Sequence, residues 1–154
     1  MREGPVVVGV DGSPESLLAL RRTLDVVSGR RATGGLDMVV VHVRHAGWTA
    51  GLVAGAQAQM LEALDEIQAD VERRTREILD PAAITWRFVI REGDPAAELI
   101  KEAEAQHAAG IAIGGHRHTT IGAVLVHSVE ASLVHTYDRS LLIVREPPAA
   151  AGSS

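Results

Sequence analysis

The residues of this sequence best suited to chemistry lie between Gly114 and Ser128, and read GGHRHTTIGAVLVHS. They follow the apolar run 111–113, and Ser128 begins a helical pattern of apolar residues. Glycines allow backbone N–H groups to approach a phosphate closely, and the N-terminus of a helix adds unpaired donors and partial positive charge. The order of strand, Gly-Gly turn, loop and helix therefore predicts an anion-binding site.

The loop departs from a glycine-rich phosphate cradle at two positions, which carry Arg117 and His127. If the backbone at position 117 needs a positive φ, a side chain there costs roughly 1 kcal/mol or more. A guanidinium, however, is itself a strong phosphate partner. The sequence leaves both readings open, an Arg117 that obstructs an anion and an Arg117 that binds it.

Three histidines in the same stretch raise the question of a metal. His116 and His118 would point the same way on an extended segment, and with a third ligand such as His127 they could hold zinc or copper. The stretch contains no carboxylate and the chain contains no cysteine, so we predict no metal site. Ser13 and Ser128 have no evident base and acid partners in the sequence, and we predict no catalytic residue and no enzymatic activity.

Composition limits the class of protein. A chain of 154 residues with 46% apolar residues is long enough for one domain with one core. A formal charge of −5 argues against a nucleic-acid partner, because phosphate binding needs clustered Lys and Arg. No apolar run approaches the roughly 20 residues that span a bilayer, and there is no signal-peptide pattern. We therefore expect a soluble, cytoplasmic protein without a membrane partner.

The elements that must position the loop alternate along the chain. Apolar runs predict strands at Val6–Val10, Asp37–Val43, Ile84–Arg91, Gly110–Gly114 and Ser140–Arg145. Helical spacing predicts a helix capped by Ser13, a long helix over Gln57–Leu79, one from Asp94 to near His107 and one over Ser128–Tyr137. The domain is expected over residues 1–146, and the Pro/Ala/Gly/Ser-rich residues 147–154 are expected to be a disordered tail.

This alternation predicts a single-domain α/β fold, a five-stranded parallel sheet with helices on both faces. In such sheets ligands bind beyond the carboxyl ends of the strands, where the strand order reverses. Three polar or glycine-containing segments follow strands there: Asp11–Ser13, His42–His45 and Gly114–His118. We expect them to converge at one edge of the sheet.

The sequence resembles the universal stress protein family over Val6 to Arg145. The resemblance rests on VVVGVDGSPES, VVVHV, EGDPAAELIKEA and the Gly114–Ser128 loop that leads to SLLIVR. It implies a Rossmann-like domain of the adenine nucleotide alpha hydrolase-like type, acting in stress tolerance rather than as a dedicated catalyst. It also implies a homodimer that pairs the last strand, Ser140 to Arg145.

Members of that family that bind ATP or AMP carry a signature of Gly, two residues, Gly, nine residues, Gly, and Ser or Thr. Its first Gly falls on Gly114 and its hydroxyl on Ser128, whereas Arg117 and His127 replace the other two glycines. The resemblance further implies Asp11 near the ribose or adenine and Val41 on the strand edge along which adenine lies. For the neighbouring His42, a histidine satisfied inside or beside the sheet is the interpretation we favour.

Two functions remain open from the sequence. The first is a stress-response module with a degenerate ATP- or AMP-type site, binding with Mg²⁺, formed by Asp11, Val41, Gly114, Arg117 and Ser128. The second is a homodimeric regulatory protein that binds no ATP and works through protein contacts.

Overall fold

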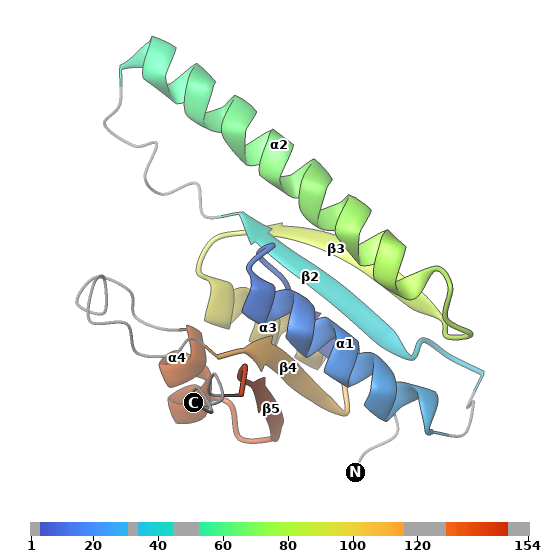
Figure 1. The fold of residues 1–154 in the computed structure, drawn as a ribbon. Coiled ribbons are helices and arrows are strands. Elements are labelled where there is room, and N and C mark those ends of the chain that lie inside the picture. The colour runs from blue at the N-terminus through green and yellow to red at the C-terminus, as the bar shows by residue number, and fades with distance from the viewer. Residues whose placement is uncertain (1–3, 31–33, 45–52, 116–128, 148–154) are drawn as a thin grey trace, which may run out of the picture.

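The computed structural model describes residues 4–30, 34–44, 53–115 and 129–147. In that part of the chain, five strands form one all-parallel sheet in the order β3-β2-β1-β4-β5. The strands are β1 (Val6–Gly9), β2 (Met38–Arg44), β3 (Trp86–Glu92), β4 (Gly110–Gly114) and β5 (Ser140–Val144). The helices that join them are α1 (Pro14–Ser28), α2 (Ala54–Leu79), α3 (Pro95–Ala105) and α4 (Val129–Thr136). The predicted fold class is confirmed, and Figure 1 shows the arrangement.

Two helices begin where the local sequence predicts. The Ser13 hydroxyl accepts the Ser16 N–H at 3.2 Å, and Pro14 occupies the first turn of α1. Asp94 caps α3 in the same way. Its carboxylate accepts the Ala97 N–H at 3.0 Å, and Pro95 is the first residue of the helix. Side-chain acceptors at the N-cap and proline in the first turn are the usual helix-start signals, because both suit backbone N–H groups that lack a helical partner.

Several predicted boundaries differ from the structure by one residue, and the starts of α2 and β3 differ by more. Helix α2 begins at Ala54 rather than Gln57, because the intervening Ala-rich residues favour helix once its first turn is formed. Strand β3 begins at Trp86 rather than Ile84. Just before it, the Thr85 N–H donates to the Asp37 carboxylate at 2.8 Å, so this backbone donor bonds to a side chain and not to the neighbouring strand.

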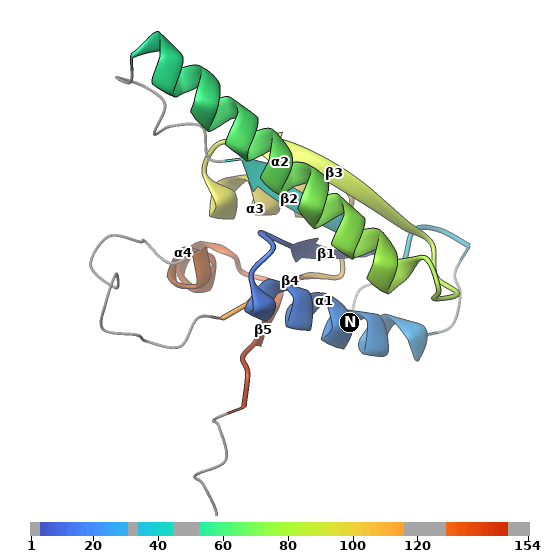
Figure 2. The same ribbon diagram turned by 45° about the horizontal axis from the view of Figure 1, so that its top comes forward.

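Each face of the sheet has its own apolar core, because successive strand residues point to opposite faces. On one face, α1 and α2 pack Leu20, Val27, Val71 and Leu79 against Val6, Val8, Met38 and Val40. On the other, α3 and α4 pack Leu99, Ala103 and Leu133 against Val7, Val39, Ile111 and Ile113. Figures 1 and 2 show the two helix pairs on opposite sides of the sheet.

The long helix α2 is packed along only part of its length. Its buried residues are Val71, Thr75 and Leu79, all in its C-terminal half. The N-terminal half extends beyond the sheet in both ribbon views (Figures 1 and 2). Among the described residues, no helix is long and apolar enough to cross a bilayer. The predicted tail lies almost wholly outside the described residues, which end at Pro147.

Candidate functional site at the carboxyl edge of the sheet

At the carboxyl edge of the sheet, the central strand β1 ends before its two neighbours, β2 and β4, and leaves a step. Strand β1 pairs with β2 up to Gly9 opposite Val41, and with β4 up to Val8 opposite Ala112. Both neighbours continue, β2 to Arg44 and β4 to Gly114. The crossovers from β1 and from β4 also leave in opposite directions here, so this is the point where the strand order reverses. Ligands of open α/β sheets bind at such points.

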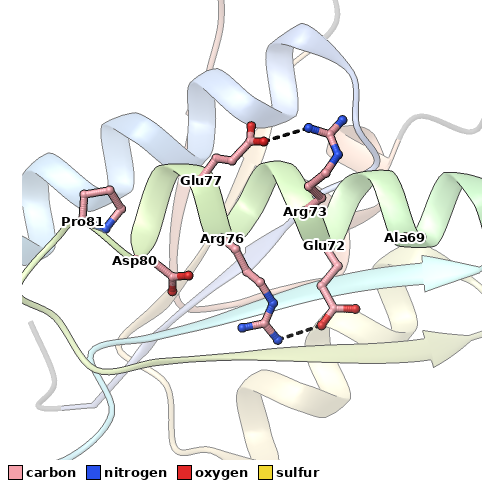
Figure 3. Close-up of a pocket in the computed structure, with 7 residues that line it drawn as sticks. All are labelled: Ala69, Glu72, Arg73, Arg76, Glu77, Asp80 and Pro81. Carbon is pink, nitrogen blue, oxygen red and sulfur yellow. Dashed lines mark hydrogen bonds and ion pairs between the residues drawn. The ribbon is translucent and has the colours of Figure 1, made fainter.

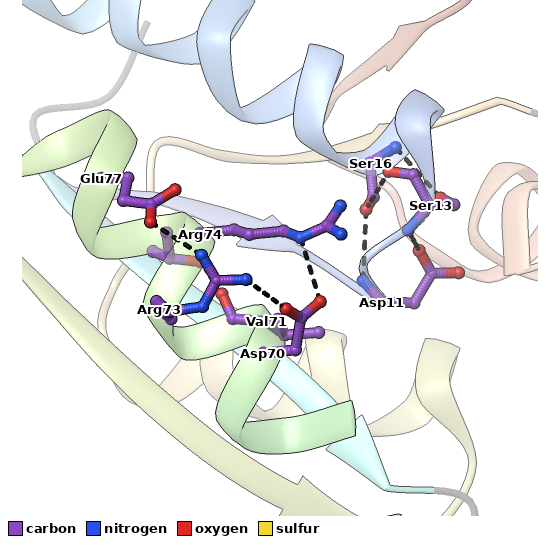
Figure 4. Close-up of polar contacts among 9 residues, drawn as sticks. Asp11, Ser13, Ser16, Asp70, Val71, Arg73, Arg74 and Glu77 are labelled. Atoms are coloured by element: carbon purple, nitrogen blue, oxygen red, sulfur yellow. Dashed lines mark hydrogen bonds and ion pairs between the residues drawn. The ribbon is translucent and has the colours of Figure 1, made fainter. Parts of the chain in front are cut away.

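The turn that follows β1 is held by its own side chains. The Asp11 carboxylate accepts the Ser13 N–H at 2.9 Å, and the Ser16 hydroxyl donates to the Ser13 carbonyl at 3.0 Å. Between them, Gly12 has φ +86°, a conformation that favours glycine. Asp11 itself is exposed at the edge. Figure 4 shows this network beside α2.

Figure 4 also shows Arg74, a cation near this turn that the sequence alone does not single out. Arg74 donates through Nε to Asp70 at 3.0 Å and extends from α2 toward the turn after β1. The turn and the helix are in contact, because a Cβ at Gly12 would lie 3.1 Å from Val71. In the sequence, Arg74 reads as one of several alternating charges on a solvated helix face, and no local signal distinguishes it.

Gly114 has a packing role that is independent of any ligand. A Cβ at this position would lie 2.4 Å from the carbonyl carbon of Glu15 and 2.6 Å from the Ser16 nitrogen. The end of β4 is therefore pressed against the backbone of the first turn of α1. Only glycine allows this approach, so the presence of glycine at 114 does not by itself indicate phosphate binding.

The backbone of Val41 is engaged within the sheet. Its carbonyl accepts the Val10 N–H at 2.9 Å, and its side chain is fully buried. Because hydrogen-bonding sides alternate along a strand, the Val43 backbone faces β1 as well. No residue of β1 pairs with Val43, because the pairing ends at Val41. The residue of β2 best placed to offer backbone groups to a ligand is thus Val43, two residues beyond the predicted Val41.

His42 is a structural residue of this edge, as the sequence interpretation favoured. Its Nδ1 lies 2.9 Å from the Val10 carbonyl, and the residue is buried. Since a carbonyl only accepts, Nδ1 carries the proton in this contact. The imidazole joins the end of β1 to β2.

On the far side of the edge, the first turn of α4 is tied to the end of β5. Arg145 forms an ion pair with Glu130, and its Nε would lie 3.0 Å from a Cβ at Gly115. Glu130 stands in the first turn of its helix, where a carboxylate is favoured by the helix dipole. Arg145 therefore lies beside both Gly115 and the first turn of α4. Between these two points the sequence predicts the anion-binding loop.

The predicted site residues Arg117 and Ser128, with His116, His118 and His127, lie outside the described residues. The described structure thus brings together Asp11, Val41 and Gly114 at one edge. Across the described ranges, no group of three His, Cys, Asp or Glu side chains lies close enough together to hold a metal ion.

Two hollows in the described surface lie away from this edge. They are lined by the C-terminal half of α2 and by the first residues of β3, at the amino edge of the sheet. Figure 3 shows two ion pairs among their charged side chains, Arg73 with Glu77 and Arg76 with Glu72. The Arg76 guanidinium also lies 5.6 Å from the Trp86 ring. These side chains form a partly exposed ion-pair surface.

Known proteins resemble this chain in both sequence and fold. The model of the universal stress protein family matches residues 4–145. The hypothetical protein MJ0577 has a TM-score of 0.77 at 18% identity, with 97% of this chain and 100% of that chain covered. The universal stress protein UspA from Lactobacillus plantarum has a TM-score of 0.74 at 16% identity, with 94% and 99% covered.

A third solved structure is a universal stress protein in complex with cAMP. Its TM-score is 0.62 at 22% identity, with 92% of this chain and 96% of that chain covered. At these identities the structures establish the fold, whereas the family match extends from before β1 to just beyond β5. This chain belongs to the universal stress protein family.

Proposed function

We propose that this chain is a stress-response module that binds an adenine nucleotide at the carboxyl edge of its sheet. The observation that carries the proposal is the step at β1. The Val43 backbone lies on the β1 side of β2, beyond the last pair between the two strands, and exposed Asp11 follows β1 at the same edge. Backbone donors and acceptors can recognise an adenine, and a carboxylate can accept hydrogen bonds from ribose hydroxyls. The solved relative in complex with cAMP supports an adenine nucleotide as the ligand class.

The phosphate side of the proposed site differs from that of a glycine-rich cradle. Gly114 is engaged in packing against α1, and Arg117 and His127 replace the other signature glycines. We therefore assign phosphate binding to the Arg117 guanidinium together with the Ser128 hydroxyl. ATP or AMP, with Mg²⁺ for ATP, and cyclic AMP are the candidate ligands.

The proposed module acts by binding and not by catalysis. In the turn after β1, the Ser13 and Ser16 hydroxyls take part in the helix cap, and neither has a hydrogen bond to any histidine among the described residues. A serine nucleophile needs a base within hydrogen-bond reach. Prolonged incubation with Mg²⁺-ATP should yield no more ADP or AMP than buffer alone, and steady turnover would contradict this part of the proposal.

The deciding experiment is calorimetric titration with ATP, AMP and cyclic AMP, with and without Mg²⁺. We expect micromolar binding that Arg117→Ala abolishes and that Arg87→Ala, at the amino edge of the sheet, leaves unchanged. Binding that survives Arg117→Ala would assign phosphate recognition to backbone groups instead. No binding of any of the three nucleotides would overturn the proposal.

A second candidate function is that of a ligand-independent homodimeric regulator. It is favoured by β5, which forms one edge of the sheet and exposes 39% of Leu142. An unpaired apolar edge strand is a ready surface for association with another chain. A tight dimer that is insensitive to every nucleotide tested would support this candidate over the first.

A further inference from the structure

Helix α2 continues past the carboxyl edge of the sheet, where the proposed nucleotide site lies. Its C-terminal half packs on the sheet through Val71, Thr75 and Leu79. Its N-terminal half extends beyond the ends of the strands in both ribbon views (Figures 1 and 2). Parallel α/β sheets bind their ligands in the space beyond the carboxyl ends of the strands. The side of this half that continues the packed face of α2 therefore borders the same space.

Two described contacts establish which way the middle of α2 faces. Val71 touches the turn after β1, because a Cβ at Gly12 would lie 3.1 Å from its Cγ2 atom. Three residues before Val71, the Gln68 side chain accepts a hydrogen bond at 3.0 Å from Arg44, the last residue of β2. Residues three apart lie about 60° from one another around a helix. The middle of α2 therefore lies across the ends of β1 and β2, with one contact to each.

Ile67 lies just beyond the contact between α2 and the turn after β1. It precedes Val71 by four residues, so it is on the same side of the helix and about 6 Å nearer the N-terminus. Helical side chains lean toward the N-terminus, which carries the Ile67 side chain further past the ends of the strands. The side chain is apolar and 47% exposed. An apolar group that covered it would remove this area from water, which is favourable.

An adenine base is the part of the proposed ligand that suits this position. The two faces of a purine are flat and largely apolar, whereas its hydrogen-bonding groups lie along its edges. The Val43 backbone, on the β1 side of β2, offers hydrogen bonds to such an edge. An aliphatic side chain offers packing to a face. Small-molecule sites usually combine apolar lining with a few polar groups that fix the orientation of the ligand.

We propose that Ile67 packs against the adenine base of the bound nucleotide, and that α2 thereby forms one wall of the site. This inference rests on the nucleotide binding proposed above. It adds to the site an apolar residue, and a helix, to which no motif of the sequence points.

Adenosine is the probe for this contact, because it carries the base without the phosphates. Ile67→Ala should weaken the binding of adenosine, AMP and ATP by one common factor, about three- to tenfold, because each ligand loses the same apolar contact. The affinity for inorganic tripolyphosphate should stay the same. Ile67→Leu keeps the apolar volume and should retain the parental affinities. Calorimetric titration measures all four ligands.

Leu61→Ala is the matched control. Leu61 is on the same helix and is 45% exposed, but it lies about 120° around the axis from Ile67. Its substitution should leave the affinities for adenosine, AMP and ATP unchanged. The two alanine variants should also have the same Tm without ligand, so that a difference in affinity does not arise from a loosened helix.

The outcomes separate this inference from the function on which it rests. A parent protein that binds no adenine ligand would overturn both. A parent that binds, with Ile67→Ala indistinguishable from Leu61→Ala, would overturn the Ile67 contact alone. Equal weakening of adenosine and tripolyphosphate would also overturn it, because the substitution would then act through the fold of α2 and not through the base.

Photolabelling locates the base without any substitution. On irradiation, 8-azidoadenosine reacts with groups close to its base, and peptide mapping by mass spectrometry identifies the labelled residues. We expect label on α2 at or next to Ile67, and we expect excess adenosine to prevent it. Adenosine-sensitive labelling that misses α2 would contradict the proposal.

Discussion

The Nδ1 atom of His42 lies 2.9 Å from the carbonyl oxygen of Val10 and joins the ends of two neighbouring strands at the carboxyl edge. Both residues are buried. The contact holds β1 at the level where its pairing with β2 ends and so defines the step at which Val43 faces the missing continuation of β1.

His42→Phe should destabilise the protein by about 1–3 kcal/mol, because it leaves a buried carbonyl without this donor. The measurement is urea unfolding, in which the midpoint should fall at an unchanged m-value. The control is His135→Phe on the exposed surface of α4, where an effect within about 0.5 kcal/mol is expected. Equal losses in the two variants would mean that the His42 bond contributes no net stability.

Gly114→Ala and Gly55→Ala should change stability in opposite directions. A Cβ at Gly114 meets the Glu15 backbone at 2.4 Å, and overpacking against a backbone that cannot rotate away costs about 1–3 kcal/mol. A Cβ at Gly55, inside α2, meets nothing within 4 Å, so alanine should gain up to about 1 kcal/mol from helix propensity. Calorimetric Tm values test both. A Gly114→Ala protein as stable as the parent would show that the first turn of α1 can shift.

Leu142→Arg should convert the proposed dimer to a monomer. The residue is partly exposed on edge strand β5, and a charge there opposes the pairing of two such edges. Size-exclusion chromatography with light scattering gives the mass. Val134→Arg, at a more exposed apolar residue of α4, is the matched control and should remain dimeric. A dimer that persists in Leu142→Arg would place the interface elsewhere.

Tyr137→Phe should stabilise the protein by roughly 1 kcal/mol, because the buried Tyr137 hydroxyl has no hydrogen-bond partner in the described structure. Burial also raises the pKa of Tyr137 above its ordinary value. The folded state then favours the protonated phenol, so stability is lost as the pH rises above about 10, the unfolded value. Unfolding between pH 8 and 11 should show the advantage of Phe growing above pH 10. A less stable Phe variant would indicate a bound water on the hydroxyl.

Much of the fold follows from short-range patterns in the sequence. The alternation of β-branched runs with helical spacing predicts a parallel α/β sheet, and Ser13-Pro14 and Asp94-Pro95 predict two helix starts to the residue. The order of the segments around VVVGVDGSPES and the Gly114–Ser128 loop indicates the family. Each of these signals acts within one turn or one strand, so it can be recognised without knowing which elements pack against that segment.

The site depended on relationships between strands and helices far apart in the chain. Val41 pairs with the last residue of β1 and Val43 lies beyond it, because the register of β1 on β2 is set by packing, which no local pattern records. Gly114 reads as a ligand glycine until α1 is seen against it. Apolar residues recur at helical spacing in both halves of α2, and only the extent of the sheet decides which of them are buried.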